Sequence, residues 1–184
     1  GDRLPDADRV DPRLNLNNQP WSLPVVFEGT TGSLRYTQPL AADWQLVAQL
    51  MQQRLRTEDR IAFPFGCSAE DDYTRYCSDG SFDLYDFRSE GERRTTRAAD
   101  IALQGTATLA DIKHHLGLGL LRSTHRARFQ RQAYNWVGIG NVDGSVVLPP
   151  DPTLTDENTH RDEASTELRL QDRIELAPAW QLWL

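Results

Sequence analysis

The histidines are the first residues of this chain whose type could support metal binding or acid–base catalysis. His114 and His115 are adjacent in a segment that alternates like a β-strand, so their side chains point to opposite faces and cannot bind one metal ion together. His125 and His160 have no partner at a ligand spacing. The run 138–144 is rich in turn residues but lacks the Lys-Ser/Thr pair of a phosphate-binding loop. These patterns predict no metal site.

Other chemistry-bearing residues are equally sparse. Ser, His and Asp are present, but no nucleophile-elbow motif is, so we expect the protein not to be an enzyme. The acidic runs 70–72 and 156–157 are typical of solvated loops. Cys67 and Cys77 are the two cysteines, and a pair alone neither requires nor excludes an oxidising compartment.

The net charge argues against a nucleic-acid partner, and the hydropathy argues against a membrane-spanning helix. The 184 residues carry 27 acidic and 20 basic side chains, for a formal net charge of −7. Non-specific nucleic-acid binding needs clustered positive charge, so we expect no nucleic-acid partner. No apolar run approaches the roughly 18 residues that a membrane-spanning helix requires.

Alternation of apolar and polar residues predicts β-strands throughout the chain. Residues 166–176 place Leu168, Leu170, Ile174 and Leu176 on one face and charged or amide side chains on the other. The segments 44–50 and 99–106 alternate in the same way, which predicts a sheet with one apolar and one polar face.

Short repeated sequences mark the turns between these strands. Leu40–Leu46 recurs as Leu176–Leu182, and Leu109–Leu116 is a weaker relative. Each contains a tight connection typical of a β-hairpin. The sequence predicts an all-β antiparallel meander of six strands, at about 26–39, 44–63, 84–109, 114–134, 160–176 and 180–184.

The predicted connections alternate in length. Those at 40–43, 110–113 and 177–179 are short, whereas those at 64–83 and 135–159 are long. Outer-membrane barrels combine short periplasmic turns with long extracellular loops in this way. Several of the strands also exceed the roughly 5–6 residues usual in globular proteins.

The number and length of the strands indicate a piece of a larger barrel. The last segment, 180–184, is shorter than the ~9–11 residues of a spanning strand. Six strands are fewer than the ~8 of the smallest bacterial single-chain barrels. We therefore expect the chain to come from within a longer gene product.

Four stretches resemble the barrel of TonB-dependent siderophore receptors. They are Asp11–Trp21, the Trp-Gln-Leu turns at 44–46 and 180–182, Arg60–Cys67, and Glu167–Ile174. The resemblance implies that residues 1–184 are a partial barrel domain, a run of strands from a 22-stranded transmembrane barrel. Residues 1–25 would be the end of an extracellular loop, and 64–83 and 135–159 would be extracellular loops. The family's plug domain and TonB box are absent from this sequence.

The resemblance also implies a function and a location. The parent protein would bind and import ferric siderophores across the Gram-negative outer membrane, using energy supplied by TonB. The partners would be the ferric siderophore and the lipid bilayer, with the TonB complex and the receptor's own plug contacted through parts outside this chain. The ferric siderophore would be the transported ligand, with no cofactor bound directly by the chain.

Aromatic and arginine side chains in the two long loops suit an anionic, flat iron chelate, because they can stack on it and pair with its charge. The alternative is that the aromatic residues pack their own loop as a small core. The candidate ligand-binding residues are Tyr73, Arg75, Tyr76, Phe82, Tyr134 and Trp136.

Two further pairs have roles that an exported barrel would explain. Cys67 and Cys77 lie in one loop, where an oxidising exterior favours a disulfide; two free thiols are the alternative. Trp44 and Trp180 stand beside equivalent short turns and would belong to the aromatic girdle at the membrane interface. On a soluble sheet they would instead cover the end of a core.

A second class of function fits the same strands. A secreted or periplasmic soluble all-β module that binds a ligand such as a carbohydrate would also alternate apolar and polar residues. The two hypotheses differ in where the apolar side chains point, namely toward lipid in the receptor or toward a dry interior in the module. The side chains that distinguish them are Leu46, Leu50, Leu103, Leu168, Leu170 and Ile174.

Overall fold

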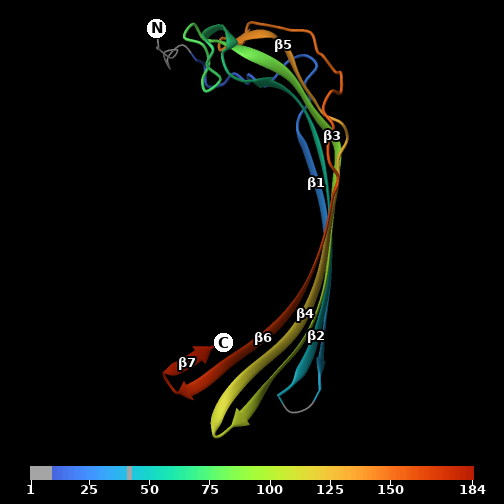
Figure 1. The fold of residues 1–184 in the computed structure, drawn as a ribbon, viewed down its shortest axis with the longest axis vertical. Coiled ribbons are helices and arrows are strands. Elements are labelled where there is room, and N and C mark those ends of the chain that lie inside the picture. Colours follow the sequence, from blue (N-terminus) through green and yellow to red (C-terminus); the bar gives the residue numbers. More distant parts are fainter. Residues whose placement is uncertain (1–9, 41–42) are drawn as a thin grey trace. The chain divides into compact units, whose positions relative to one another are not determined.

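The computed structural model describes residues 10–40 and 43–184 as an all-β protein without α-helices, built on one antiparallel sheet (Figure 1). The strands in these residues are β1 (Val26–Pro39), β2 (Gln45–Pro64), β3 (Ser81–Leu109), β4 (Ile112–Arg128), β5 (Ala133–Asn141), β6 (Arg161–Ala177) and β7 (Trp180–Trp183). A short 3-10 helix, η2 (Ser68–Glu70), follows β2. No helix among the described residues is long and apolar enough to cross a membrane.

The strand order follows the chain with one exception. It runs β1-β2-β3-β4-β6-β7, and β5 pairs with β3 off this path. At the turn between β3 and β4, Ala110 and Asp111 have φ angles of 50° and 61°. Positive φ at both central residues is the geometry of a two-residue hairpin turn whose twist matches that of the strands. This confirms the predicted antiparallel meander and its short turn after residue 109.

The predicted strand at 114–134 is confirmed up to residue 128 and wrong after it. β4 ends at Arg128, and β5 is a separate strand that pairs with Ser81–Arg88 of β3. Residues 135–141 of the predicted long loop therefore belong to β5, and residues 81–83 of the predicted loop 64–83 belong to β3. Strand β5 contains two glycines and two asparagines, which mask its alternation, and only its pairing with the distant β3 makes it a strand.

Two predicted segments fall partly outside the described residues. The predicted turn at 40–43 includes residues 41–42, and the predicted loop end at 1–25 includes residues 1–9. The described part of the latter, 10–25, contains turns rather than strands, as predicted.

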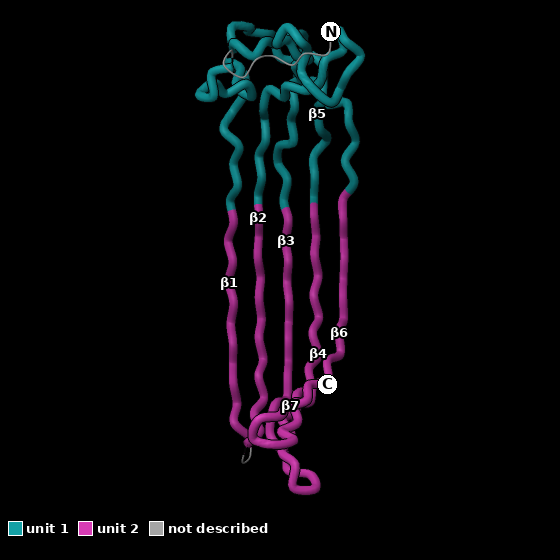
Figure 2. Tube along the Cα trace, turned by 90° about the vertical axis from the view of Figure 1, so that its left-hand side faces the viewer, with its two compact units in different colours: residues 1–28, 56–93, 128–159 teal, residues 29–55, 94–127, 160–184 magenta. Residues whose placement is uncertain are grey.

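The chain divides into two compact units (Figure 2). Unit 1 comprises residues 1–28, 56–93 and 128–159, and unit 2 comprises residues 29–55, 94–127 and 160–184. The core of unit 1 consists of Ala62, Phe82, Leu84 and Val142. Partly buried side chains packed on it come from the N-terminal segment, the disulfide loop, β5 and the chain after β5: Val10, Leu16, Trp21, Tyr76, Val137 and Leu148.

Unit 2 is a sheet whose two faces differ in chemistry. Register pairs Leu118 with Leu170 and Leu120 with Leu168 on one face of β4 and β6. On neighbouring strands, Gln45 contacts Gln104, Gln53 contacts Thr31 and Thr96 contacts His125, which places these polar residues together on the other face. Because side chains alternate along each strand, the intervening apolar residues share the face of the leucine pairs.

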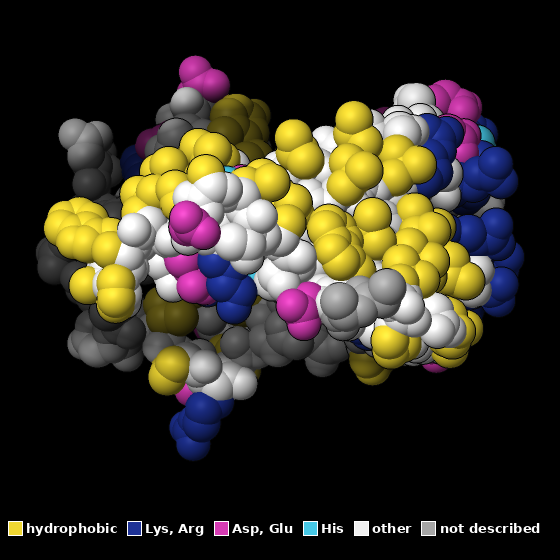
Figure 3. All heavy atoms as spheres, turned by 90° about the horizontal axis from the view of Figure 1, so that it is seen from below, with side chains coloured by type: hydrophobic (Ala, Val, Ile, Leu, Met, Phe, Trp, Pro, Cys, Tyr) yellow, Lys and Arg dark blue, Asp and Glu magenta, His cyan; other side chains and the backbone are white. Residues whose placement is uncertain are grey.

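We call that side of unit 2 the apolar face, and the opposite side the polar face. The apolar face carries Leu34, Leu46, Leu50, Ile101, Leu103, Leu118, Leu120, Leu168 and Leu170. None of the described residues forms a second layer over it, and Leu168 and Leu170 are 76% and 78% exposed. Viewed from the end with the short turns, hydrophobic side chains cover much of the near surface, with basic side chains along one margin and a few charged ones between the hydrophobic groups (Figure 3).

Candidate ligand-binding site

The pairing of β3 with β5 places aromatic side chains next to one another in unit 1. Register sets Tyr85 opposite Trp136 and Phe87 opposite Tyr134. The rings of Tyr85 and Tyr134 stack with centroids 4.6 Å apart and planes 3° apart. Offset stacking and edge contacts each add to the stability gained from burying the rings. These four residues form an aromatic surface on β3 and β5.

The end of β2 extends this surface. The Phe63 ring lies 5.6 Å from Tyr134 in an edge-on arrangement and 5.9 Å from the Phe65 ring. We call this group the aromatic platform: Phe63, Phe65, Tyr85, Phe87, Tyr134 and Trp136. Trp136 is its most accessible member, with 55% of its surface exposed. A planar aromatic or sugar ring could stack on Trp136 without any change in the sheet.

Asp83 connects the aromatic platform to the disulfide loop. Trp136 Nε1 donates to Asp83 Oδ1 over 3.1 Å. The backbone N–H and the hydroxyl of Ser68 donate to Asp83 over 2.7 and 2.8 Å. Asp83 is 1% exposed, and these three donors compensate its carboxylate for the loss of water. The indole of Trp136 is therefore held in one orientation.

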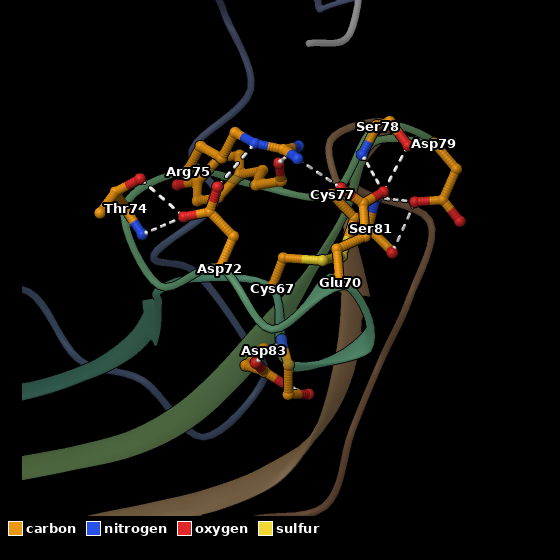
Figure 4. The surroundings of a disulfide bond; sticks show 12 residues. Cys67, Glu70, Asp72, Thr74, Arg75, Cys77, Ser78, Asp79, Ser81 and Asp83 are labelled. Carbon is orange, nitrogen blue, oxygen red and sulfur yellow. Dashed lines mark hydrogen bonds and ion pairs between the residues drawn. A yellow bond between two sulfur atoms is a disulfide. The ribbon is translucent and has the colours of Figure 1, made fainter. Parts of the chain in front are cut away.

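The structure joins Cys67 and Cys77 in a disulfide whose Cα atoms lie 5.0 Å apart (Figure 4). Within the loop, Cys67 and Asp72 exchange backbone hydrogen bonds of 2.8 and 3.0 Å. Asp71 turns the chain with a φ of 52°. The Glu70 carboxylate lies within 4.8 Å of both sulfurs, but sulfurs bonded to each other provide no thiolate for a metal ion.

Charges inside the disulfide loop are paired with one another (Figure 4). Arg75 lies between two carboxylates, 2.7 Å from Glu70 and 2.9 Å from Asp72. The hydrogen bonds that Ser78 donates to the Glu70 carboxylate lower its pKa, and the positive charge of Arg75 lowers it further. The hydrogen bonds that Thr74 donates to the Asp72 carboxylate lower its pKa in the same way, and Arg75 again contributes. Both carboxylates are thus stabilised in their charged form.

The six predicted ligand-binding residues divide into two groups. Phe82 is 3% exposed in the core of unit 1, and Tyr76 packs on it with ring centroids 4.9 Å apart. Burial raises the pKa of Tyr76, as expected for a phenol partly removed from water. With Arg75 held by two acids, these three residues stabilise the loop, which was the alternative interpretation of the cluster.

Tyr134, Trp136 and Tyr73 remain accessible. Tyr73 packs beside Gly66, where a Cβ would lie 2.8 Å from the Tyr73 ring. Burial is the main cause that raises the pKa of Tyr85, and the charges of Asp83 and Tyr73 raise it further. Tyr73 therefore also lies near the aromatic platform. The structure thus brings together residues from both predicted loops.

Sequence reasoning missed the remaining platform residues as site residues. They are Phe63 and Phe65 at the end of β2, and Tyr85 and Phe87, which alternate with the buried Leu84 and Asp86 along β3. That period-2 pattern was the available signal. The face it leads to could be assigned only once β5 was recognised as the partner strand.

The predicted interface tryptophans both lie beside short turns of unit 2. Trp44 lies across Gly105, where a Cβ would stand only 2.2 Å from the indole ring. Trp180 begins β7 and is largely exposed. His114 and His115 point to opposite faces, where they contact Asp172 over 2.7 Å and Glu175 over 2.5 Å. This confirms the prediction that the two adjacent histidine side chains point to opposite faces of the sheet.

Comparisons with protein families, with curated proteins and with solved structures give no match to this chain.

Proposed function

We propose that the chain forms part of the β-barrel of an outer-membrane receptor that binds and imports ferric siderophores with energy from the TonB system. The apolar face of unit 2 carries this proposal. Its leucines on β4 and β6 lie opposite one another and are exposed to the surroundings. A water-soluble sheet would cover such a face with a second layer, whereas a membrane barrel presents it to lipid.

The polar face supports the same proposal. Arg169 pairs with Asp100, and His115 pairs with Glu175, so charged groups on this side satisfy one another. The interior of a large membrane barrel is polar and hydrated and accommodates such pairs. Strands that alternate lipid-facing and water-facing residues over this length are the pattern expected for such a barrel.

The aromatic platform supports a binding role. Trp136 and Tyr134 offer ring faces, and the phenol hydroxyls of Tyr73 and Tyr85 lie nearby. A ferric siderophore with planar chelating groups would stack on these rings and accept hydrogen bonds from the hydroxyls. The proposal names no residue of this chain as a contact for the TonB complex or for the plug.

Titration of the chain in detergent micelles with a ferric catecholate chelate and a ferric hydroxamate chelate tests the proposal. Binding would be followed by quenching of tryptophan fluorescence. We expect one chelate class to bind, and Trp136→Ala to weaken its binding about tenfold, equivalent to about 1.4 kcal/mol. Trp183→Ala removes another exposed tryptophan, from β7, and should leave the affinity unchanged.

Two outcomes would contradict this function. If neither chelate class binds, a ferric siderophore is not the ligand of this chain. Binding of an oligosaccharide by a chain that stays monomeric in detergent-free buffer would favour the alternative, a secreted or periplasmic carbohydrate-binding module. The aromatic platform itself could serve such a ligand, because sugar rings also stack on indole and phenol rings.

A further inference from the structure

An open groove of about 560 Å³ lies in unit 2 where the apolar face ends. Leu34, Leu50 and Ala99 supply apolar side chains to it. Arg97 and Arg122 supply its positive charge. The groove therefore combines a hydrocarbon surface with two guanidinium groups, which suits an amphiphilic ligand with an anionic head.

Both arginines belong to the apolar face rather than the polar one. Arg97 Nε donates to Gln52 Oε1 over 2.9 Å, and Gln52 is two residues from Leu50 on β2. Arg122 lies opposite Thr166 in the register that pairs Leu120 with Leu168. On β3, Arg97 is two residues from Ala99, the last apolar side chain of that strand on the apolar face. On β4, Arg122 is likewise two residues from Leu120.

Neither arginine has an acidic partner among the described residues. Arg97 contacts the neutral amide of Gln52, and Arg122 donates to the hydroxyl of Thr166 over 2.7 Å. On the polar face, by contrast, Arg169 and Arg173 have the carboxylates of Asp100 and Glu175 within ion-pair distance. Two positive charges beside a hydrocarbon surface are therefore left without a counter-charge from residues 10–40 and 43–184.

We propose that this groove binds a phosphate-bearing membrane lipid, with the phosphate between Arg97 and Arg122 and the start of an acyl chain on Leu34, Leu50 and Ala99. The guanidinium group matches phosphate oxygens in two parallel hydrogen bonds, and this pairing is strong where water is partly excluded. Basic side chains at the edge of a hydrocarbon layer are attracted to anionic head groups in the same way.

This inference rests on the proposed membrane location. The lipid supplies both the missing counter-charge and the apolar contact, which a free phosphate ion cannot do. An arginine on a lipid-facing strand is unfavourable at mid-membrane depth but tolerated near the interface. The position of both residues at the end of the apolar face agrees with interfacial depth.

Native mass spectrometry of the chain in non-ionic detergent tests the site. The chain is titrated with phosphatidylglycerol and with phosphatidylcholine of the same acyl chains, with inorganic phosphate as a competitor. We expect tighter binding of phosphatidylglycerol, whose phosphate charge is not compensated within the lipid. Arg97→Gln/Arg122→Gln should weaken that binding about tenfold, equivalent to about 1.4 kcal/mol, and leave phosphatidylcholine binding unchanged.

Matched variants separate the site from general charge and from misfolding. Arg169→Gln/Arg173→Gln removes the same charge from the polar face and should keep the phosphatidylglycerol affinity within about twofold. Arg97→Lys/Arg122→Lys keeps the charge without the planar fork, and should give an intermediate affinity. A strand-type circular dichroism spectrum is required of every variant that is compared.

Equal binding of the two lipids, an unchanged affinity in Arg97→Gln/Arg122→Gln, or displacement of the lipid by millimolar inorganic phosphate would overturn the site. Flotation of the chain with vesicles distinguishes this failure from failure of the proposed function. A chain that floats with vesicles of both lipids but shows no preference overturns the lipid site alone. A chain that floats with neither overturns the membrane location and the lipid site together.

Discussion

At the scale of single residues, the contact between Trp44 and Gly105 fixes the approach of β2 to β3 in unit 2. The indole ring occupies the space that any side chain at position 105 would need. A large aromatic ring across a strand glycine restores the packing that the glycine lacks. Glycine is thus required here for close approach rather than for its backbone freedom.

Gly105→Ala should therefore destabilise the sheet by about 1–3 kcal/mol, the usual cost of overpacking. Chemical unfolding in detergent, followed by tryptophan fluorescence, measures this change. Gly117→Ala is the matched control, because its Cβ would meet the nearest atom at an ordinary 3.7 Å. Trp44→Ala should remove most of the cost of Gly105→Ala, and a cost that persists in the double variant would contradict the steric explanation.

The paired charges of the disulfide loop predict a response to pH. The folded state lowers the pKa of Glu70 and of Asp72, so it favours their charged forms. This stabilisation is present above the pKa values of the unfolded chain and is lost as the pH falls through the lower folded values. Below about pH 4 the loop should open more readily than at neutral pH.

Hydrogen exchange of residues 68–79 across the acidic range measures that opening. Glu70→Gln should exchange faster at neutral pH and show a smaller acid response, because it lacks the titrating group that Ser78 and Arg75 stabilise. Acid sensitivity equal to that of the unchanged chain would contradict the assignment to Glu70.

The disulfide itself should stabilise the folded loop by about 2–3 kcal/mol, since it restricts a short loop of the unfolded chain. Reduction, or Cys67→Ser/Cys77→Ser, should lower the urea midpoint of unit 1. The reducing agent should have no further effect on Cys67→Ser/Cys77→Ser, which serves as the control.

At the scale of the elements, β6 presents alternating residues to two environments. Leu168 and Leu170 lie on the apolar face, whereas Glu167, Arg169 and Gln171 lie on the polar face. A charged side chain placed on the lipid side of a barrel strand lowers the free energy of unfolding by about 2–4 kcal/mol at mid-membrane depth. A substitution at a position exposed to water usually changes it by less than about 0.5 kcal/mol.

Leu170→Arg therefore separates the two environments. In lipid vesicles it should destabilise the folded chain by about 2–4 kcal/mol, whereas Gln171→Arg should be nearly neutral. Reversible urea unfolding from vesicles gives both values. Equal, small effects at the two positions would indicate that both faces of β6 contact water.

The strands could be predicted from the sequence where alternation and turns coincide. The long segments ending at residues 39 and 109 are observed within a few residues of the predicted bounds, because period-2 patterning and turn residues act locally. Strand β5 could not be found in this way. Its residues are held by long-range pairing with β3, which no local pattern specifies.

The candidate site was predictable only in composition. The two predicted loops do meet, since Trp136 of the second donates a hydrogen bond to Asp83 of the first. The burial of Phe82 depends on the N-terminal segment and on Val142, which are distant in sequence. Whether an aromatic residue faces a ligand or a core is decided by such distant partners, and not by its neighbours in the chain.

At the scale of the whole molecule, the exposed apolar face predicts behaviour in water. Strand edges and large apolar surfaces without a partner promote association. We expect the chain to oligomerise or bind a hydrophobic dye in detergent-free buffer, and to become monodisperse in detergent. Light scattering with dye fluorescence measures this, and a monodisperse monomer that binds no dye would argue against an uncovered face.

The most direct test of the central claim is a spin-label scan along residues 166–172 of β6 in lipid vesicles, one cysteine at a time. Collision rates are measured with oxygen, which concentrates in lipid, and with a water-soluble nickel chelate. If the apolar face contacts lipid, positions 168 and 170 will favour oxygen, while 167, 169 and 171 will favour the chelate. High chelate accessibility at 168 and 170, without a period of two, would contradict the membrane barrel.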